Sequence, residues 1–176
     1  MNNQYGKYNK EVTLLSLDTS STKTGWAIFK DAKYIKSGVI DWSYIKDGNN
    51  RAIWILNDII YLIESNEPSI VVIEKDVVGS GKRLNMSTIN ILTKIIGGVW
   101  GYIWSINREY PIDEFPIFYA EYAPSEWRKF VDIKGRKREE YKQASIKRIK
   151  DVYNIDVDDN EADAINIGDA YIKQWG

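Results

Sequence analysis

Three acidic residues occupy places in the sequence where carboxylates can converge on a cation. Asp18 ends the apolar run VTLLSLD, Glu74 ends the apolar run SIVVIE, and Asp163 lies in the acidic segment DDNEADAINIGDA. If the two runs are neighbouring strands, both acids sit at the carboxyl edge of a sheet, where sites of open α/β sheets form. Asn160 precedes Asp163 by three residues, so helical spacing puts both on one face.

Carboxylates that converge in this way repel one another unless cations bind between them. Two divalent ions about 4 Å apart form the standard clamp for in-line phosphodiester hydrolysis. The chain has no His and no Cys, which excludes thiolate zinc sites, the Ser-His-Asp triad and an imidazole base. Hydrolysis would therefore rest on carboxylates and hard cations such as Mg²⁺ or Mn²⁺. Each acid alone also fits a turn, a helix cap or a helix dipole; the combination of three favours a metal site.

The stretch DTSSTKTGWAIF after the first acid is rich in small hydroxyl residues. Hydroxyls and backbone N–H groups in such a turn can hold a phosphate. A Ser- and Thr-rich hairpin turn explains the same residues, and both interpretations stay open.

A basic segment runs from residue 128 to residue 150, with ten Lys and Arg against three Asp and Glu, although the whole chain has a net charge of −1. Such a local excess would bind a phosphate backbone in a salt-dependent way. A solvated helix face is the alternative. Gly135 within KGRKR predicts an exposed loop, and Lys82 and Arg83 would extend the same surface.

The elements that must position these residues follow from periodicity and turn residues. We expect strands at 12–18, 25–29, 34–40, 69–74 and 116–122, with 25–29 and 34–40 paired as an antiparallel hairpin. We expect helices at 51–63, from the cap residue Ser87 to about Arg108, from Pro124, at 138–153, and at 160–174 with Asp159 or Asn160 as its cap. This order predicts a mixed sheet with helices on its faces.

The long helix from Ser87 carries two further features. Gly97 and Gly98 would permit close packing against a neighbour. Trp100 and Trp104 share a face, which is more typical of a core or a dimer interface than of base stacking.

Length and composition predict one soluble domain over residues 11–176, preceded by a flexible tail at 1–10. The first ten residues do not read as a signal peptide, and charges interrupt the apolar stretches, so we expect no membrane span and a cytoplasmic location.

The acidic motifs together resemble those of RuvC-type Holliday junction resolvases. LSLDTSSTKTGWAIF is similar to their opening strand and turn, VVIEK to their second acidic strand, and NEADAINIG to their C-terminal acidic helix. INILTKIIGGVWGYI and APSEWRKFVDIKGRKREEYKQ resemble their long helix and their basic loop, so the likeness spans nearly the whole chain. The compact, Asn- and Lys-rich style resembles phage-borne members, found in bacteria or phage-infected cells.

The resemblance implies an RNase H-like α/β fold with a mixed five-stranded sheet flanked by helices, a homodimer, and two Mg²⁺ or Mn²⁺ ions per active site. Each protomer would cut one strand of a four-way or other branched DNA. Carried over by position, Asp18, Glu74 and Asp163 match catalytic, metal-binding acids. Lys137 or Lys142 would take the basic role near the scissile phosphate. The residues expected to contact DNA are Lys82, Arg83, Lys134, Arg136, Lys137 and Arg138.

Asn160 departs from the family pattern, which has Asp or His at this position. An amide oxygen can bind a hard cation but brings no charge, so the second ion would be held more weakly. Glu161 or Asp159 would compensate, although Glu161 should point about 100° away on the helix.

Two alternatives remain. A branched-DNA-binding protein with weak or lost cleavage would also explain Asn160. A small-molecule kinase of the actin-like superfold shares a DTSSTKTG-like turn, but such kinases need two of these domains and have no use for a basic surface. The sequence does not indicate whether a branch-migration motor is a partner.

Overall fold

The computed structural model describes residues 12–75, 85–111, 114 and 116–175. Its ten elements are β1 (Thr13–Thr19), β2 (Lys23–Lys30), β3 (Lys33–Asp41), α1 (Gly48–Asn66), β4 (Ile70–Glu74), α2 (Met86–Asn107), β5 (Phe118–Tyr122), α3 (Pro124–Phe130), α4 (Arg138–Tyr153) and α5 (Asp159–Trp175). The predicted strands and helices are all present, and their bounds differ by a few residues. The tail predicted at residues 1–10 lies outside the described residues.

The five strands form one mixed sheet in the order β3-β2-β1-β4-β5. β2 pairs with β1 and β3 antiparallel, whereas β4 pairs with β1 and β5 parallel. The predicted hairpin and the predicted mixed sheet are therefore confirmed. β1 is the centre of the sheet, and its parallel neighbour β4 ends at the same edge.

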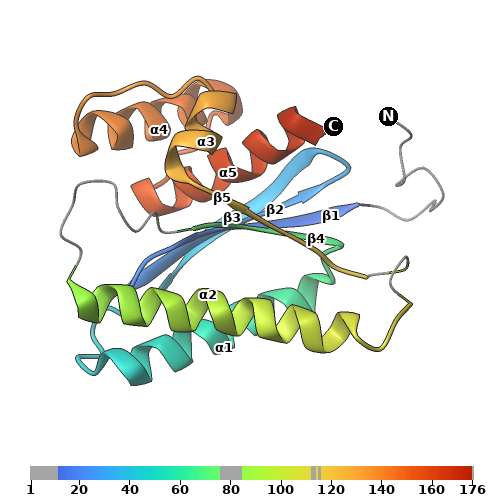
Figure 1. Ribbon diagram of the computed structural model, residues 1–176. Helices are drawn as coiled ribbons and strands as arrows, with labels where there is room; N and C mark the ends of the chain where they lie inside the picture. The colour runs from blue at the N-terminus through green and yellow to red at the C-terminus, as the bar shows by residue number, and fades with distance from the viewer. Residues whose placement is uncertain (1–11, 76–84, 112–113, 115, 176) are drawn as a thin grey trace.

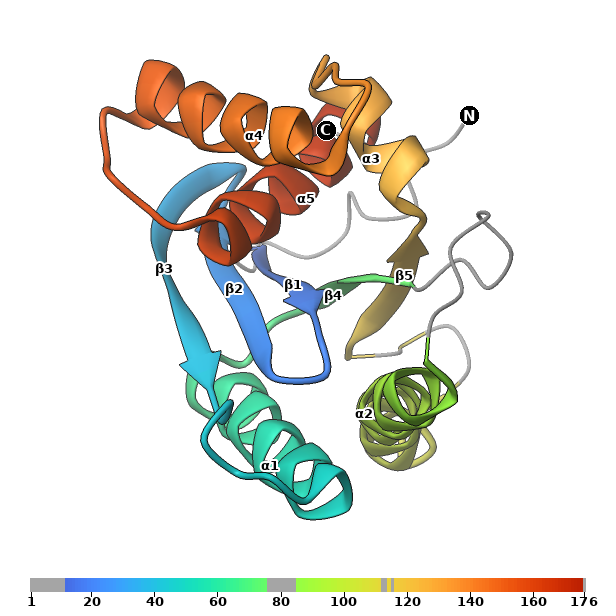
Figure 2. The ribbon, with the colours of Figure 1, turned by 90° about the vertical axis from the view of Figure 1, so that its left-hand side faces the viewer.

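Two helical layers cover the sheet (Figures 1 and 2). α1 and α2 lie on one face, and α3, α4 and α5 lie on the other. The central strand is buried on both sides because its side chains alternate: Leu15 and Leu17 pack in the core under α1 and α2, whereas Leu14 packs in the core under α5.

Local sequence fixes where the helices begin. Asp47 caps α1 by accepting from the Asn50 N–H at 2.7 Å. α2 is capped by Asn85, whose side chain accepts from the Ser87 N–H at 3.1 Å. The prediction that Ser87 itself is the cap was wrong, because an Asn two residues earlier offers an equally good acceptor.

The glycine pair of α2 behaves unequally. A Cβ on Gly98 would lie 2.5 Å from Leu56 of α1, so the predicted close packing is confirmed there. A Cβ on Gly97 would meet nothing within 4 Å, so Gly97 has no close neighbour among the described residues, and close packing there stays a prediction.

α2 is long and apolar enough to cross a membrane if length and composition alone are considered. Within this fold, however, Ile91, Ile95, Val99 and Ile103 are buried in the core shared with the sheet and α1. Packing within the domain therefore accounts for these four side chains, whereas Trp100 and Trp104 of the same helix are exposed.

Candidate active site

The two strand acids lie on neighbouring parallel strands. Leu17 of β1 is in register with Ile73 of β4, so Asp18 and Glu74 are the next residues on each strand. Alternation gives Asp18 the same face as Leu14, and that face is covered by α5. The predicted placement of both acids at one edge of the sheet is therefore confirmed.

The first turn of α5 comes very close to this edge. Gly25 of β2 pairs with Asp18, and a Cβ added to Gly25 would lie 1.9 Å from the Asn160 carbonyl oxygen. Only glycine leaves room for the helix there. Asp158 caps the helix by accepting from the Glu161 N–H at 2.9 Å, so the predicted caps, Asp159 or Asn160, were each placed too late.

Asp163 follows one turn later, and its charge reaches Asp18. Burial raises the pKa of the Asp18 carboxyl well above its usual value, and the negative charges of Glu74 and Asp163 add to the rise. Burial also raises the pKa of Asp163 to about 6. The site therefore gathers three carboxylates where their full ionisation is unfavourable without a compensating cation.

Two of these acids accept hydrogen bonds from the helices above them. The indole Nε1–H of Trp127 on α3 donates to Glu74 Oε2 at 2.6 Å. The Ser145 hydroxyl on α4 donates to Asp163 Oδ1. Neither donor was predicted from the sequence, because a Trp in a short helix and a Ser in an amphipathic helix are ordinary core residues.

Arg128 is the positively charged residue whose charge affects the acids most. Its guanidinium lies over the rings of Trp127 and Tyr141, at 4.9 Å and 4.7 Å from their centroids. Its charge lowers the pKa of both Asp18 and Asp163, against the larger effect of burial. Its Nε is buried and has no hydrogen-bond partner among the described residues. The sequence indicated Arg128 only as one member of the basic segment.

Lys142, one of the two residues predicted for the basic role in the site, lies beside the acidic start of α5. Its Nζ forms an ion pair with Asp159 Oδ2 at 2.5 Å, and both side chains are half-buried. Burial raises the pKa of Asp159, but the hydrogen bond and the charge of Lys142, together with the charge of Arg138, leave that pKa below its usual value. Lys142 also lowers the pKa of Asp163, so its charge is felt within the site.

Glu161, predicted as an additional metal ligand, is turned toward β3. Its Oε1 accepts from the Ser37 hydroxyl at 2.6 Å, and Ser37 in turn bonds the Tyr34 hydroxyl at 2.7 Å. The helical offset noted in the sequence explains this outcome, because residues one apart on a helix point about 100° away from each other.

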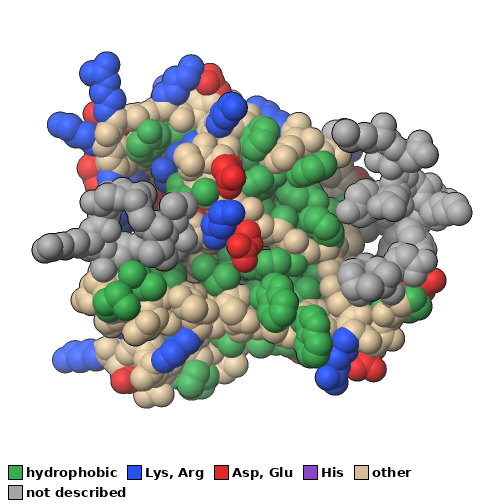
Figure 3. All heavy atoms as spheres, viewed as in Figure 1, with side chains coloured by type: hydrophobic (Ala, Val, Ile, Leu, Met, Phe, Trp, Pro, Cys, Tyr) green, Lys and Arg blue, Asp and Glu red, His purple; other side chains and the backbone are tan. Residues whose placement is uncertain are grey.

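The predicted DNA-contacting residues that the structure describes are all exposed and flank the start of α4. They are Lys134, Arg136, Lys137 and Arg138. Figure 3 shows Lys and Arg side chains gathered over this part of the molecule, at the upper left. Lys134 lies 3.0 Å from Asp132 in a highly exposed ion pair, which leaves its charge largely available to solvent. Lys82 and Arg83 lie outside the described residues.

The donor set suits a hard cation, because it consists of carboxylate oxygens with the Asn160 amide nearby in sequence. Among residues 12–75, 85–111, 114 and 116–175, no three acidic side chains are close enough to hold one ion jointly. Two of the three acids are instead held by Trp127 and Ser145. The fold thus brings the carboxylates to one edge of the sheet, but among the described residues they do not surround a single position that an ion could occupy.

Several solved resolvase structures share this arrangement of strands and helices. RuvC of Thermus thermophilus in complex with a Holliday junction substrate has a TM-score of 0.66 at 14% identity, over 92% of this chain and 93% of that one. The chain has the fold of the RuvC-type resolvases. Fowlpox virus resolvase, solved with Holliday junction DNA, has a TM-score of 0.60 at 19% identity, over 93% and 98%. The yeast mitochondrial Holliday junction resolvase has a TM-score of 0.61 at 12% identity, over 98% of this chain and 82% of that one.

The likeness is one of structure. No protein-family model matches the sequence, and no curated protein is significantly similar to it. The RNase H-like architecture predicted from the acidic motifs is confirmed.

Proposed function

We propose that this chain is a metal-dependent endonuclease that resolves four-way DNA junctions and cuts other branched DNA. The observation that carries the proposal is the placement of Asp18, Glu74 and Asp163 at one edge of the sheet. The resolvase fold supports it, since structures with this fold include complexes with Holliday junction DNA.

Asp18, Glu74 and Asp163, with Asn160, would hold two Mg²⁺ or Mn²⁺ ions, which would activate the attacking water and stabilise the leaving oxygen. The protein's own contribution is to gather and orient the acids. Trp127 holds Glu74 from α3, and the Gly25 contact brings the start of α5 to the sheet.

The cations around the acids would serve the substrate. Arg128 and Lys142 place positive charge close to the carboxylates, where it can stabilise the scissile phosphate. The exposed residues Lys134, Arg136, Lys137 and Arg138 would bind the backbone of a flanking arm.

The proposed homodimer would use the outer face of α2. Trp100 and Trp104 are exposed there, although large aromatic side chains are usually buried in a core or an interface. Gly97 and Gly101 lie on the same face with open space beyond their Cα atoms, which would let a second helix approach. Replacing both Trp residues with Ser should convert a dimer into a monomer in light scattering coupled to gel filtration.

The test is cleavage of an end-labelled four-way junction by purified protein in Mg²⁺, in Mn²⁺ and in EDTA. Metal-dependent nicks placed symmetrically across the junction are expected. Tight junction binding without nicks in either metal would overturn the nuclease proposal and leave the binding protein with lost cleavage. Restoration of nicking by Asn160→Asp would then identify Asn160 as the cause.

A further inference from the structure

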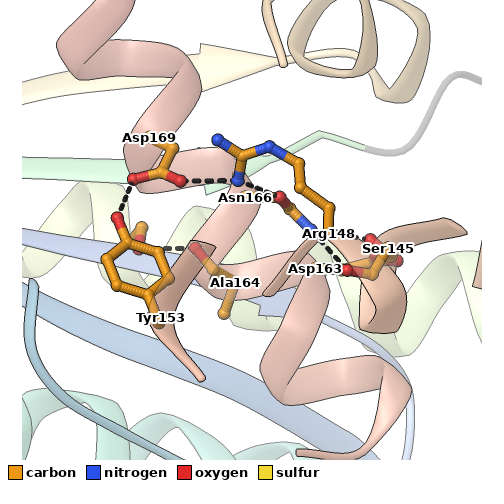
Figure 4. Close-up of polar contacts among 8 residues, drawn as sticks. Ser145, Arg148, Tyr153, Asp163, Ala164, Asn166 and Asp169 are labelled. Atoms are coloured by element: carbon orange, nitrogen blue, oxygen red, sulfur yellow. Dashed lines mark hydrogen bonds and ion pairs between the residues drawn. The ribbon is translucent and has the colours of Figure 1, made fainter. Parts of the chain in front are cut away.

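A chain of hydrogen bonds runs through the α4–α5 interface and ends on Asp163 (Figure 4). Ser145 Oγ donates to Asp163 Oδ1, and Asn166 Nδ2 donates to Ser145 Oγ at 2.8 Å. Arg148 Nη1 donates to Asn166 Oδ1 at 2.6 Å. Ser145 and Asn166 are fully buried, so water does not compete for these bonds.

The other end of this series of hydrogen bonds, at Arg148, is also held by side-chain contacts. Arg148 Nη1 forms an ion pair with Asp169 Oδ2 at 2.6 Å, and the two side chains are only 16% and 10% exposed. The Tyr153 hydroxyl donates to Asp169 Oδ1 at 2.6 Å. Arg148 thus counts toward the basic segment of the sequence but points into the protein.

The direction of every donor follows from the arginine. A guanidinium can only donate, so Arg148 obliges Asn166 to offer its oxygen there and its NH₂ to Ser145. The Ser145 oxygen then accepts from Asn166, and its single proton is directed at Asp163. The network therefore directs the Ser145 proton at Asp163, whose Oδ1 accepts it.

We propose that Ser145 is a positioning residue for Asp163, and that Asn166 and Arg148 hold the Ser145 hydroxyl in its donating orientation. The bond to Oδ1 fixes the rotation of the carboxylate and leaves Oδ2 to bind a divalent cation. The inference rests on the proposed function, because the metal-binding role of Asp163 belongs to it. Loss of such an outer hydrogen bond typically weakens metal affinity about 10- to 100-fold.

Ser16 on β1 provides a matched control. Its hydroxyl is also fully buried and also donates to α5, to the Ala164 carbonyl oxygen at 2.7 Å. Ser16→Ala removes a buried hydrogen bond of the same kind without touching a carboxylate. A general loosening of α5 would affect both variants, whereas a positioning role affects Ser145→Ala alone.

The experiment measures Mn²⁺ binding without DNA, as the rise in Tm with Mn²⁺ concentration, and then junction cleavage across the same concentrations. Both alanine variants should lose similar stability without metal. Ser145→Ala should need about 10- to 100-fold more Mn²⁺ in both assays, whereas Ser16→Ala should follow the wild type. Equal Mn²⁺ requirements in Ser145→Ala and the wild type would overturn the positioning role.

If Ser145→Ala does not fold, Ser145→Cys keeps the buried volume nearly constant and offers only a weak donor, and it should show the same weakened Mn²⁺ response. Failure of the proposed function gives a different pattern. Wild-type protein that binds Mn²⁺ without nicking junctions, beside a Ser145→Ala variant with weakened binding, supports the positioning role and overturns the nuclease. Wild-type protein that shows no Mn²⁺ response overturns both.

Discussion

The two faces of the sheet are built from different kinds of residue. Every buried residue of α1 and α2 is apolar, and these helices close one face with a core of isoleucine, leucine and valine side chains. On the other face, α4 and α5 bury Ser145, Asn166 and Asp169, and Arg148 lies almost as deep. Buried polar groups cost free energy unless they are paired. We infer that the first face serves stability, whereas the second also holds the site.

Strand β1 contributes side chains to both faces of the sheet. Along β1, alternate side chains enter the apolar core or face α5, and Asp18 continues the row that faces α5. The same strand thus links the site to the centre of the sheet, which is buried on both faces.

The largest effect is expected from Asp18→Asn. Removing a metal-binding charge should lower junction cleavage roughly a thousandfold or more, because such charge stabilisation is worth several kcal/mol. Junction binding should stay equal or become tighter, since one negative charge is lost. Gel-shift and single-turnover assays on the same preparation measure both quantities. Full cleavage by pure variant protein would remove Asp18 from the site.

Ile59→Ala alters the apolar face instead, and it should affect stability but not metal binding. Ile59 is a fully buried residue of α1, so the cavity should lower the free energy of unfolding by about 2 to 5 kcal/mol. The Mn²⁺ concentration needed for cleavage should not change, provided that assays are run well below the lowered Tm. A shifted metal requirement would mean that the two faces are coupled more tightly than this division allows.

The pH dependence of the free energy of unfolding should reflect the raised pKa values of Asp163 and Asp18, on the face of the sheet that α4 and α5 cover. The pKa of Asp163 is raised to about 6, and that of Asp18 is raised as well, while Glu74, Asp159, Arg128 and Lys142 act on them. A raised folded pKa means that stability is fully present below the unfolded value of about 4 and is lost as pH rises through 6.

In EDTA, this loss between pH 4 and pH 7 should amount to up to about 3 kcal/mol from Asp163. Urea unfolding at several pH values measures it, with Asp163→Asn as the control that should remove most of it. Saturating Mn²⁺ should abolish it, because the cation stabilises the ionised acids. A pH slope that persists unchanged in Asp163→Asn would assign the effect to other groups.

The smallest expected effect concerns the exposed edge of the polar face. Replacing Lys137 and Arg138 together with Ala should weaken junction binding and reduce the slope of log K against log salt by about one to two. Cleavage at saturating protein should be retained. An unchanged slope in fluorescence anisotropy titrations would mean that the start of α4 does not contact phosphate.

The sequence predicted the parts of the site that depend on local pattern. Asp18 and Glu74 end short apolar runs, and Asp163 lies at the start of an amphipathic helix, so their elements were predictable from spacing alone. Helix caps were less predictable, since Asn85 and Ser87 are both good capping residues and only the backbone decides between them.

The groups that orient the acids could not be predicted in this way. Ser145 and Asp163 are eighteen residues apart on different helices, and Trp127 is far from Glu74 in sequence. Arg128 and Arg148 belong to one basic run, yet packing turns both inward while Lys137 stays exposed. Such contacts arise from how helices pack, which residue type and local periodicity do not specify.

The most direct test of the account is the anomalous density of Mn²⁺ in crystals of the protein grown or soaked with the ion. We predict a peak bound by Asp18 and Asp163, with Glu74 turned toward it, and loss of that peak in Asp18→Asn. Well-ordered carboxylates with no peak among them at millimolar Mn²⁺ would contradict the claim that this edge of the sheet is a metal-dependent active site.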